Sequence, residues 1–379
     1  MKPIRGDWLD QAATQAVFAV LSENPTYVVG GCVRNTLLGH PVKDVDFATA
    51  ARPEMVTAKA EAAGMRVVPT GVEHGTVTVI VGDQPFEVTT FRRDVETDGR
   101  RAVVEFADSL EHDALRRDFT INAIYADAKG HLVDPAGGLP DIAERRIRFI
   151  ENAENRIKED YLRSLRFFRF QAWFADPSGG LDPDAIDAIA RNIDGLETLS
   201  RERVGSEIVR LLEAPTPAFA VAAMRTTGVL HSVLPGSDDT GLAPLVHLEE
   251  TLGVPADPMR RLAVLGGETE SLRLSRLQAR QVAALRDNLM LDPSELGYRL
   301  GAEIGRDVLL VAGALLGKKV DLYDLAKVRA ATSLTFPLKA ADLIPEFEGR
   351  ALGERLKVLE QAWIESGFTL SRDALLSRG

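Results

Sequence analysis

The chain has 379 residues, more than the roughly 250–300 at which single cores stop growing, so at least two domains are expected. Its single cysteine, Cys32, excludes a disulfide framework within the chain, and six histidines without a CxxC pair argue against a zinc site. The net charge of −11 argues against a nucleic-acid partner held by overall charge.

Residues 145–169 depart from this acidic average. They contain eight basic and four acidic residues, which gives the segment a net charge of +4. Such a run is either a solvated helix face or a local patch for phosphates, and its composition alone leaves both interpretations open.

The sequence predicts no membrane segment. The first 20 residues are typical of a partly amphipathic helix and lack the continuous apolar core of a signal peptide. The longest apolar run, residues 308–316, is about half as long as a spanning helix requires. We therefore expect a soluble, cytoplasmic protein with no membrane partner, and the pattern gives no indication of its oligomeric state.

The N-terminal part of the chain alternates short β-like runs with helical ones. A helix is expected at 32–39, and charged residues 92–102, which include a glycine, are expected to form a mobile connector. Strands are expected at residues 26–31, 43–49, 65–70, 76–82 and 86–91.

The strand signal disappears after about residue 150. One helix with a single buried stripe is predicted there by spacings of three or four between Ile157, Tyr161, Leu165, Phe168 and Ala172. The remaining sequence is also helical in character, with breaks at proline- and glycine-containing segments.

The predicted fold class is therefore α+β. A catalytic head with a mainly antiparallel or mixed sheet is expected at residues 1–145. An all-α neck is expected at 146–215, followed by an all-α body and tail at 216–379.

Asp44 and Asp46 are the first candidates for chemistry. They lie two apart in a β-like run, so both carboxylates can share one face of a strand. Two close carboxylates repel unless a cation lies between them, and Mg²⁺ prefers such ligands together with substrate phosphates. Most such pairs are simply surface residues. However, Gly30 and Gly31 close a strand and open a helix fourteen residues upstream, and backbone N–H groups there can approach a phosphate, with Arg34 one turn further on.

Several motifs, in order, resemble the class II tRNA nucleotidyltransferases and bacterial poly(A) polymerases of the polymerase-β superfamily. They span over 150 residues and are GGCVRNTLLG with KDVDFAT, HGTVTVI, FEVTTFRRD, RRDFTINA, DPAGGLPD, EDYLRSLRFFRF and LSRERVGSEI. The resemblance implies a polymerase-β-like head in which Asp44 and Asp46 are catalytic ligands of Mg²⁺. One position departs from the family's usual G-G-x-V-R-D: this chain has Asn35, which keeps a hydrogen-bonding oxygen but has no charge.

The resemblance implies further site residues. Glu87 is a candidate third catalytic carboxylate, with an exposed strand-edge residue as the alternative. The motif RRDFTINA, expected to form a helix, implies contacts to the ribose and phosphates of the incoming nucleotide, with salt bridges between neighbours as the alternative. The implied nucleotide-binding residues are Gly30, Gly31, Arg34, Arg116, Arg117, Asp118, Asn122, Asp160, Arg163 and Arg166.

Asp160 and Arg163 in EDYLR would project from one face of the expected helix. The Watson–Crick edges of C and A present an amino donor beside a ring-nitrogen acceptor, so a carboxylate beside a guanidinium complements both and opposes G and U. The resemblance implies that this pair replaces a nucleic-acid template, with residues Glu202, Arg203 and Glu207 steadying the selecting helix. Taken alone, the pair would be a weak surface ion pair.

These implications predict an enzyme that adds CCA to the 3′ end of tRNA from CTP and ATP, with Mg²⁺ as cofactor. A poly(A) polymerase and a partial enzyme that adds only A or only CC stay open. A phosphohydrolase is not supported, because the only His-Asp dipeptide, His112–Asp113, lies just before RRDFT in the head. A binding module without catalysis would not need the Asp44–Asp46 pair.

Overall fold

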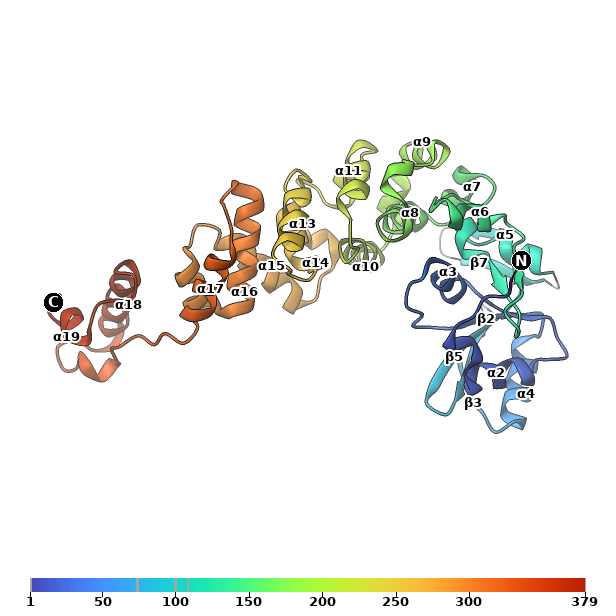
Figure 1. Ribbon diagram of the computed structural model, residues 1–379, viewed down its shortest axis with the longest axis horizontal. Helices are drawn as coiled ribbons and strands as arrows, with labels where there is room; N and C mark the ends of the chain where they lie inside the picture. Colours follow the sequence, from blue (N-terminus) through green and yellow to red (C-terminus); the bar gives the residue numbers. More distant parts are fainter. Residues whose placement is uncertain (1, 73–74, 99–100, 108, 379) are drawn as a thin grey trace. The chain divides into compact units, whose positions relative to one another are not determined.

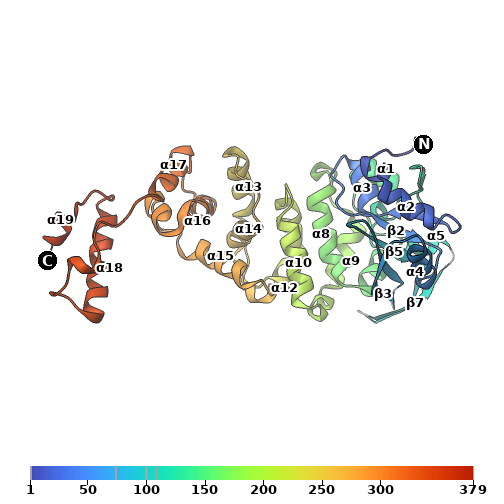
Figure 2. The same ribbon diagram turned by 90° about the horizontal axis from the view of Figure 1, so that it is seen from below.

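The computed structural model describes residues 2–72, 75–98, 101–107 and 109–378. The chain divides into two compact units, residues 1–235 and 236–379, drawn in Figures 1 and 2. Within these described ranges, the strands and all predicted site residues belong to the first unit. The α+β fold class is confirmed, and the predicted boundaries after residues 145 and 215 stay predictions.

A seven-stranded mixed sheet carries the first unit, in the order β3-β4-β5-β2-β1-β8-β9. β2 and β5 are parallel, and the other neighbours are antiparallel. The strands are β1 (Thr26–Val29), β2 (Asp46–Thr49), β3 (Arg66–Gly71), β4 (Thr76–Val81), β5 (Gln84–Thr90), β8 (Tyr125–Ala126) and β9 (Leu132–Val133).

Apolar side chains cover both faces of the central strands. Successive residues of β2 point to opposite faces, so Phe47 and Ala48 pack in different places. The Phe47 ring lies 4.9 Å from that of Phe18 in α2 (Ala12–Val20), and α2 also contacts β4 together with α4 (Pro53–Ala62). Ala48 belongs to a second buried cluster with Phe91 and Tyr125. Burial on both faces fixes the register of β2 and therefore the place where it begins.

The segment expected to be a mobile connector, residues 92–102, is instead part of a two-stranded antiparallel sheet. Its strands are β6 (Arg92–Asp98) and β7 (Arg101–Phe106), and residues 99–100 lie outside the described part of the chain. The expectation of a connector rested on the charged residues and the glycine. The segment also contains β-branched residues, such as Val95, Val103 and Val104, that favour strands.

The first unit also contains most of the short helices. They are α1 (Asp7–Asp10), α3 (Gly31–Leu38), α5 (Leu110–Leu115), α6 (Gly138–Ala143), α7 (Ala153–Glu159), α8 (Leu162–Phe174), α9 (Pro183–Arg191), α10 (Arg201–Leu212), α11 (Ala218–Thr226) and α12 (Val229–Val233), with the 3₁₀ helices η2 (Thr120–Asn122), η3 (Pro177–Gly179) and η4 (Ile193–Thr198). Helices α8 and α10 pack side by side (Figures 1 and 2).

The single helix predicted across residues 157–172 is wrong. Asp160 is extended (φ −155°, ψ 103°) and separates α7 from α8. Its carboxylate accepts the backbone N–H of Leu162 at 3.1 Å, and such local side-chain bonds compete with helix continuation. The apolar spacing runs across the break in the sequence because residues on both sides of it, such as Ile157 and Leu165, are buried.

The second unit is helical throughout its described residues. A buried ion network joins three of its helices. The Arg260 guanidinium lies 2.7 Å from the carboxylates of both Glu249 and Asp307, and Arg260 is 0% exposed. The helices are α13 (Leu242–Thr251), α14 (Pro258–Leu265), α15 (Arg276–Asp287), α16 (Pro293–Leu316), α17 (Leu322–Ala331), α18 (Gly349–Glu365) and α19 (Arg372–Leu376), with η5 (Thr269–Leu272) and η6 (Ala340–Asp342). Among the described residues, no helix combines the length and apolarity needed to cross a membrane.

Candidate active site

Three carboxylates gather at one edge of the sheet. Asp46, the first residue of β2, is aligned with Glu87 in the parallel pair with β5. Asp44 was expected on the same strand, but it lies in the loop before β2. Burial raises the pKa of Asp46 to about 6, and the charges of Glu87 and Asp44 act in the same direction against Arg117. This edge therefore concentrates negative charge that a bound cation would neutralise.

The glycine turn lies at the same edge. Val29, the last residue of β1, is aligned with Asp46, so the turn that follows β1 is next to the carboxylates. Gly30 has φ 77°, a region that glycine adopts without strain, and α3 starts at Gly31. A Cβ atom at Gly30 would lie 3.8 Å from Nη1 of Arg117. The first N–H groups of α3 and the Arg117 guanidinium thus provide donors for a phosphate.

The motif RRDFTINA is not the helix that was expected. Helix α5 ends at Leu115, and η2 is a single 3₁₀ turn. Its polar side chains are held by tertiary contacts: Asp118 accepts hydrogen bonds from Arg166 Nε at 2.7 Å and Asn122 Nδ2 at 2.9 Å. Asn122 Oδ1 in turn accepts one from Arg34 Nη1 at 2.5 Å. The structure therefore joins four predicted nucleotide-binding residues into one chain of contacts.

Asp113, which was not among the predicted site residues, anchors the two arginines of this motif. Its buried carboxylate lies 2.7 Å from Arg116 and 3.0 Å from Arg117, and it accepts a hydrogen bond from the Tyr125 hydroxyl at 2.8 Å. Burial favours a raised pKa, but Arg117 and Arg116 outweigh it and hold the pKa of Asp113 at about 2. The spacing to Arg116 and Arg117, three and four residues, was the available signal.

Three arginines surround the ring of Phe170. The guanidinium carbons of Arg34, Arg166 and Arg169 lie 5.1, 5.4 and 4.6 Å from its centroid. Burial and the charge of Arg169 lower the pKa of Arg34 to about 10. Arg169, which pairs with Glu207 at 2.6 Å, was not predicted, although its three-residue spacing from Arg166 on α8 places both on one side of the helix.

Asp160 and Arg163 do not share a helix, because α8 begins after Asp160. Asp160 pairs with Arg203 of α10 at 2.6 Å, and the steadying role predicted for that helix stays a prediction. Arg163 pairs with Glu159 at 2.5 Å and donates to the carbonyl oxygen of Arg116 at 2.9 Å. The two side chains therefore have separate partners within the protein.

Asn35 is bound on both sides of its amide. Its Oδ1 accepts hydrogen bonds from Arg34 Nη2 at 2.9 Å and Nε at 3.2 Å. Its Nδ2 donates to the carbonyl oxygen of Pro41 at 2.8 Å, in the loop that leads to Asp44. The aspartate usual in the family's motif could accept from Arg34 but could not donate to Pro41.

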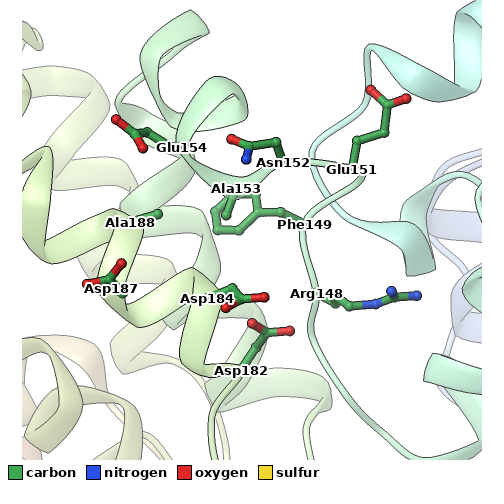
Figure 3. Close-up of a pocket in the computed structure, with 10 residues that line it drawn as sticks. All are labelled: Arg148, Phe149, Glu151, Asn152, Ala153, Glu154, Asp182, Asp184, Asp187 and Ala188. Atoms are coloured by element: carbon green, nitrogen blue, oxygen red, sulfur yellow. The ribbon is translucent and has the colours of Figure 1, made fainter.

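Two pockets of the first unit differ in chemistry. One, of about 550 Å³, is lined by Asp44 and Asp46 together with Arg34 and Arg169. The other, of about 370 Å³, lies beside α7 and α9, and carboxylates dominate its lining (Figure 3). Its acidic residues are Glu151, Glu154, Asp182, Asp184 and Asp187, none of which was predicted as a site residue. An acidic lining repels phosphates, so the first pocket is the candidate site for a nucleotide.

Comparisons with known proteins cover most of the chain. The Poly A polymerase head domain matches residues 26–148, and the probable RNA and SrmB-binding site of polymerase A matches residues 180–240. CCA tRNA nucleotidyltransferase 1, mitochondrial, of Danio rerio is 32% identical over 376 residues, 92% of this chain and 86% of the relative. A CCA-adding enzyme of Streptococcus pneumoniae is 34% identical over 372 residues, 92% of this chain and 91% of the relative.

A solved structure agrees with these relatives. The CCA-adding enzyme of Bacillus stearothermophilus in complex with CTP is similar with a TM-score of 0.75 and 31% sequence identity, covering 97% of this chain and 94% of that chain. The similarity therefore extends beyond the catalytic head. The chain belongs to the family of CCA-adding tRNA nucleotidyltransferases.

Proposed function

We propose that the protein adds CCA to the 3′ end of tRNA from CTP and ATP, releasing pyrophosphate. The observation that carries the chemistry is the register of β2, which places Asp46 between Glu87 and the end of β1, where the Gly30 turn begins. Acidic groups and phosphate donors then lie side by side, as nucleotidyl transfer requires. The proposal includes the cytoplasm as its compartment, which suits the buried free thiol of Cys32.

Asp44 and Asp46 fit a Mg²⁺ ion. No group of three histidine, cysteine, aspartate or glutamate side chains able to hold a metal is found in the described part of the chain. Mg²⁺ is commonly bound by one or two carboxylates, with waters and substrate phosphates completing its shell. When bound, it would favour ionisation of the RNA 3′-hydroxyl and neutralise charge on the triphosphate.

The reaction joins the RNA 3′ oxygen to the α-phosphorus of the nucleotide as the bond to pyrophosphate breaks. Glu87, aligned with Asp46, is proposed to receive the hydroxyl proton. Arg117 beside Gly30, and Arg34 with Arg166 around Phe170, are proposed to bind the triphosphate. Asp118 and Asn122 hold two of these arginines in place, and Arg116 is held by Asp113.

Base selection is proposed to use Asp160 and Arg163. Their present partners, Arg203 and Glu159, hold each group by charge-assisted bonds that a base can exchange or share. The carboxylate accepts the amino group of C or A, and the guanidinium donates to the ring nitrogen. A poly(A) polymerase is the less favoured alternative, because the relatives that cover most of this chain have names for CCA addition.

The test is the 3′ sequence of the product. A tRNA transcript lacking its terminal CCA is incubated with the protein, Mg²⁺ and CTP, ATP or both, and the 3′ ends are sequenced. We expect termination after CCA when both nucleotides are present. Long A tails would support the poly(A) alternative, and no incorporation of either nucleotide would contradict every polymerase reading.

The metal assignment is tested with Asp44→Ala. This variant should lose addition by at least about a thousandfold while retaining tRNA binding. Asp83→Ala, an exposed aspartate in the turn before β5, is the matched control and should retain wild-type activity. Normal addition by Asp44→Ala would refute the assignment.

A further inference from the structure

A cavity of the second unit contains none of the residues that are assigned above to nucleotide addition. It occupies about 510 Å³ and is lined by the loop after α13 together with α16 and α17, which pack against each other (Figure 1). Cavities of this size commonly enclose a small ligand, with mainly apolar walls and a few polar groups that fix its orientation. The lining of this cavity has both features.

Apolar side chains form most of the lining. Leu252 and Val254 come from the loop after α13, and Leu322 and Leu325 come from the first turns of α17. Leu322 is 68% exposed, which leaves a large apolar side chain in contact with water. A ligand with an apolar body would cover this surface, and the removal of apolar surface from water favours binding.

Two arginines supply positive charge to the same cavity. Arg306 of α16 is held in place by its neighbour Asp307, whose Oδ1 lies 2.9 Å from its Nε and 2.8 Å from its Nη2. Arg329 of α17 is exposed, and it forms no ion pair within the part of the chain that the structure describes. Guanidinium groups bind carboxylates and similar anions by paired N–H donors.

Glu303 limits the charge that the cavity accepts. It is the only acidic residue of the described lining, so two arginines and one glutamate give a net charge of +1. A single negative charge balances this lining, whereas a chain of phosphates would also meet the Glu303 carboxylate. The charges and the apolar walls together fit a monoanion with an apolar body better than they fit RNA.

The cavity adjoins the buried ion network of this unit. The Asp307 oxygen that holds Arg306 also accepts a hydrogen bond from Nη1 of Arg260 at 2.7 Å. Nη2 of Arg260 donates to the carbonyl oxygen of Pro255, which lines the cavity. A ligand at Arg306 therefore contacts groups that depend on the folded network, and binding to the folded state alone raises stability.

We propose that this cavity binds a small amphipathic monoanion, namely a carboxylate or sulfonate attached to an apolar body. The anionic group is bound by Arg306 and Arg329, and the apolar body lies against the leucines of the loop and of α17. This binding activity is separate from nucleotide addition and does not rest on the proposed function.

The first test is calorimetric titration of the full-length protein with decanoate. We expect saturable binding of one decanoate per chain. Hexanoate, with four fewer methylene groups, should bind at least about tenfold more weakly, since a fully buried methylene contributes up to about fourfold. Decyltrimethylammonium keeps the apolar chain but reverses the charge, and it should not bind. Uptake without saturation, or equal binding of the ammonium, would overturn the inference.

Substitutions locate the site. Arg329→Ala removes no ion pair of the described chain, so it should keep the wild-type Tm while raising the Kd for decanoate by about tenfold or more. Ala326→Trp adds a ring to the lining at an exposed position and should abolish binding. Arg280→Ala removes an exposed arginine of α15 outside the cavity and is the matched control. Equal effects of Arg329→Ala and Arg280→Ala would contradict the proposed site.

Thermal unfolding gives an independent readout. Decanoate at about ten times its Kd should raise the unfolding transition of the wild-type second unit by several degrees, and it should not raise that of Ala326→Trp. An equal shift in both proteins would mean that decanoate binds elsewhere and would refute the inference.

RNA binding distinguishes the alternative occupant. The Kd of Arg329→Ala for tRNA should stay within about twofold of wild type. If tRNA affinity and its salt dependence fell while decanoate binding was unchanged, the cavity would belong to an RNA-binding surface and the inference would be wrong. Neither measurement requires catalysis, so absence of CTP and ATP incorporation would contradict only the proposed function.

Discussion

At the scale of single residues, Asp113 shows how one buried carboxylate sets the position of two arginines. Its folded pKa of about 2 lies below the ordinary value of 3.8 because Arg117 and Arg116 outweigh the effect of burial. A carboxylate with a lowered pKa stabilises the fold above its unfolded pKa, and this contribution is lost as pH falls toward the folded value. The difference corresponds to about 2 kcal/mol.

Asp113→Asn should therefore lower the free energy of unfolding near neutral pH by about 2–4 kcal/mol, since it leaves both arginines without their buried partner. The pH dependence between about 4 and 2 should also become shallower. Urea unfolding measured across this range checks both effects. Asp187→Asn, which removes the exposed partner of Arg191, is the control and should change stability by less than about 0.5 kcal/mol. Equal effects of the two variants would contradict the anchoring role.

The departure from the family's motif at Asn35 leads to a separate prediction. Asn35→Asp keeps the acceptor for Arg34 but loses the donor to the Pro41 carbonyl, so the loop before Asp44 should loosen. We expect kcat/KM for CTP to fall about fivefold, the effect of about one hydrogen bond. Asn192→Asp removes a similar 2.8 Å bond, to the Ala188 carbonyl, and should leave kcat/KM unchanged. An unchanged kcat/KM in Asn35→Asp would show that the donor has no catalytic importance.

At the scale of elements, Tyr161, which follows the break between α7 and α8, packs closely on η4. A Cβ atom at Gly195 would come within 2.0–2.4 Å of the ring of Tyr161, the residue after Asp160. Such overlap requires Tyr161 to move, and its movement would displace Asp160 from Arg203.

Gly195→Ala should therefore lower Tm by several degrees and increase misincorporation of GTP or UTP relative to CTP and ATP. Gly179→Ala in the nearby η3 is the control, because no atom lies within 4 Å of its added Cβ. Thermal unfolding and sequencing of products made with all four nucleotides measure the two effects. If Gly195→Ala kept both Tm and fidelity, the contact would not position Asp160.

At the scale of the whole molecule, each compact unit has its own buried ion network. The second contains the buried network of Arg260, Glu249 and Asp307, in which removal of one partner leaves buried charge uncompensated. Arg260→Met should cost about 3–5 kcal/mol in the unfolding of this unit. Arg350→Met, which breaks an exposed pair with Glu354, should cost less than about 0.5 kcal/mol.

Calorimetry with and without CTP checks this prediction. We expect Arg260→Met to lower the unfolding transition of the second unit. CTP affinity, which the proposed function assigns to the first unit, should stay within about twofold of wild type. A loss of CTP binding that parallels the loss of stability would instead indicate one cooperative fold.

Much of the head was predictable from sequence because its signals are local. The glycine turn, Arg34 and most strands follow from patterns within a few residues. The alignment of Asp46 with Glu87 could not be predicted from sequence, because it depends on the parallel pairing of β2 and β5, which are far apart in sequence. The resemblance, not the pattern, selected Glu87.

The errors share a cause. The α7–α8 break was hidden because apolar periodicity records burial and not backbone continuity, and Asp160 interrupts the helix without interrupting the stripe. The spacing of Asp113 from Arg116 and Arg117 is visible in the sequence, but its burial and its contact with Tyr125 depend on the fold. Tertiary contacts, rather than local sequence preference, determine both the helix break and the role of Asp113.

The arginines around Phe170 have a consequence for chemical reactivity. Dicarbonyl reagents such as phenylglyoxal attack a guanidine in its neutral form, which is scarce for an ordinary arginine with a pKa of 12.5. With its pKa near 10, Arg34 has a neutral fraction more than a hundredfold larger at a given pH, and it lines the cleft that admits the reagent. We expect Arg34 to be modified first, with CTP protecting it, as peptide mass mapping would reveal. Burial, together with the charge of Arg169, thus makes the candidate phosphate site a selective target for covalent labelling.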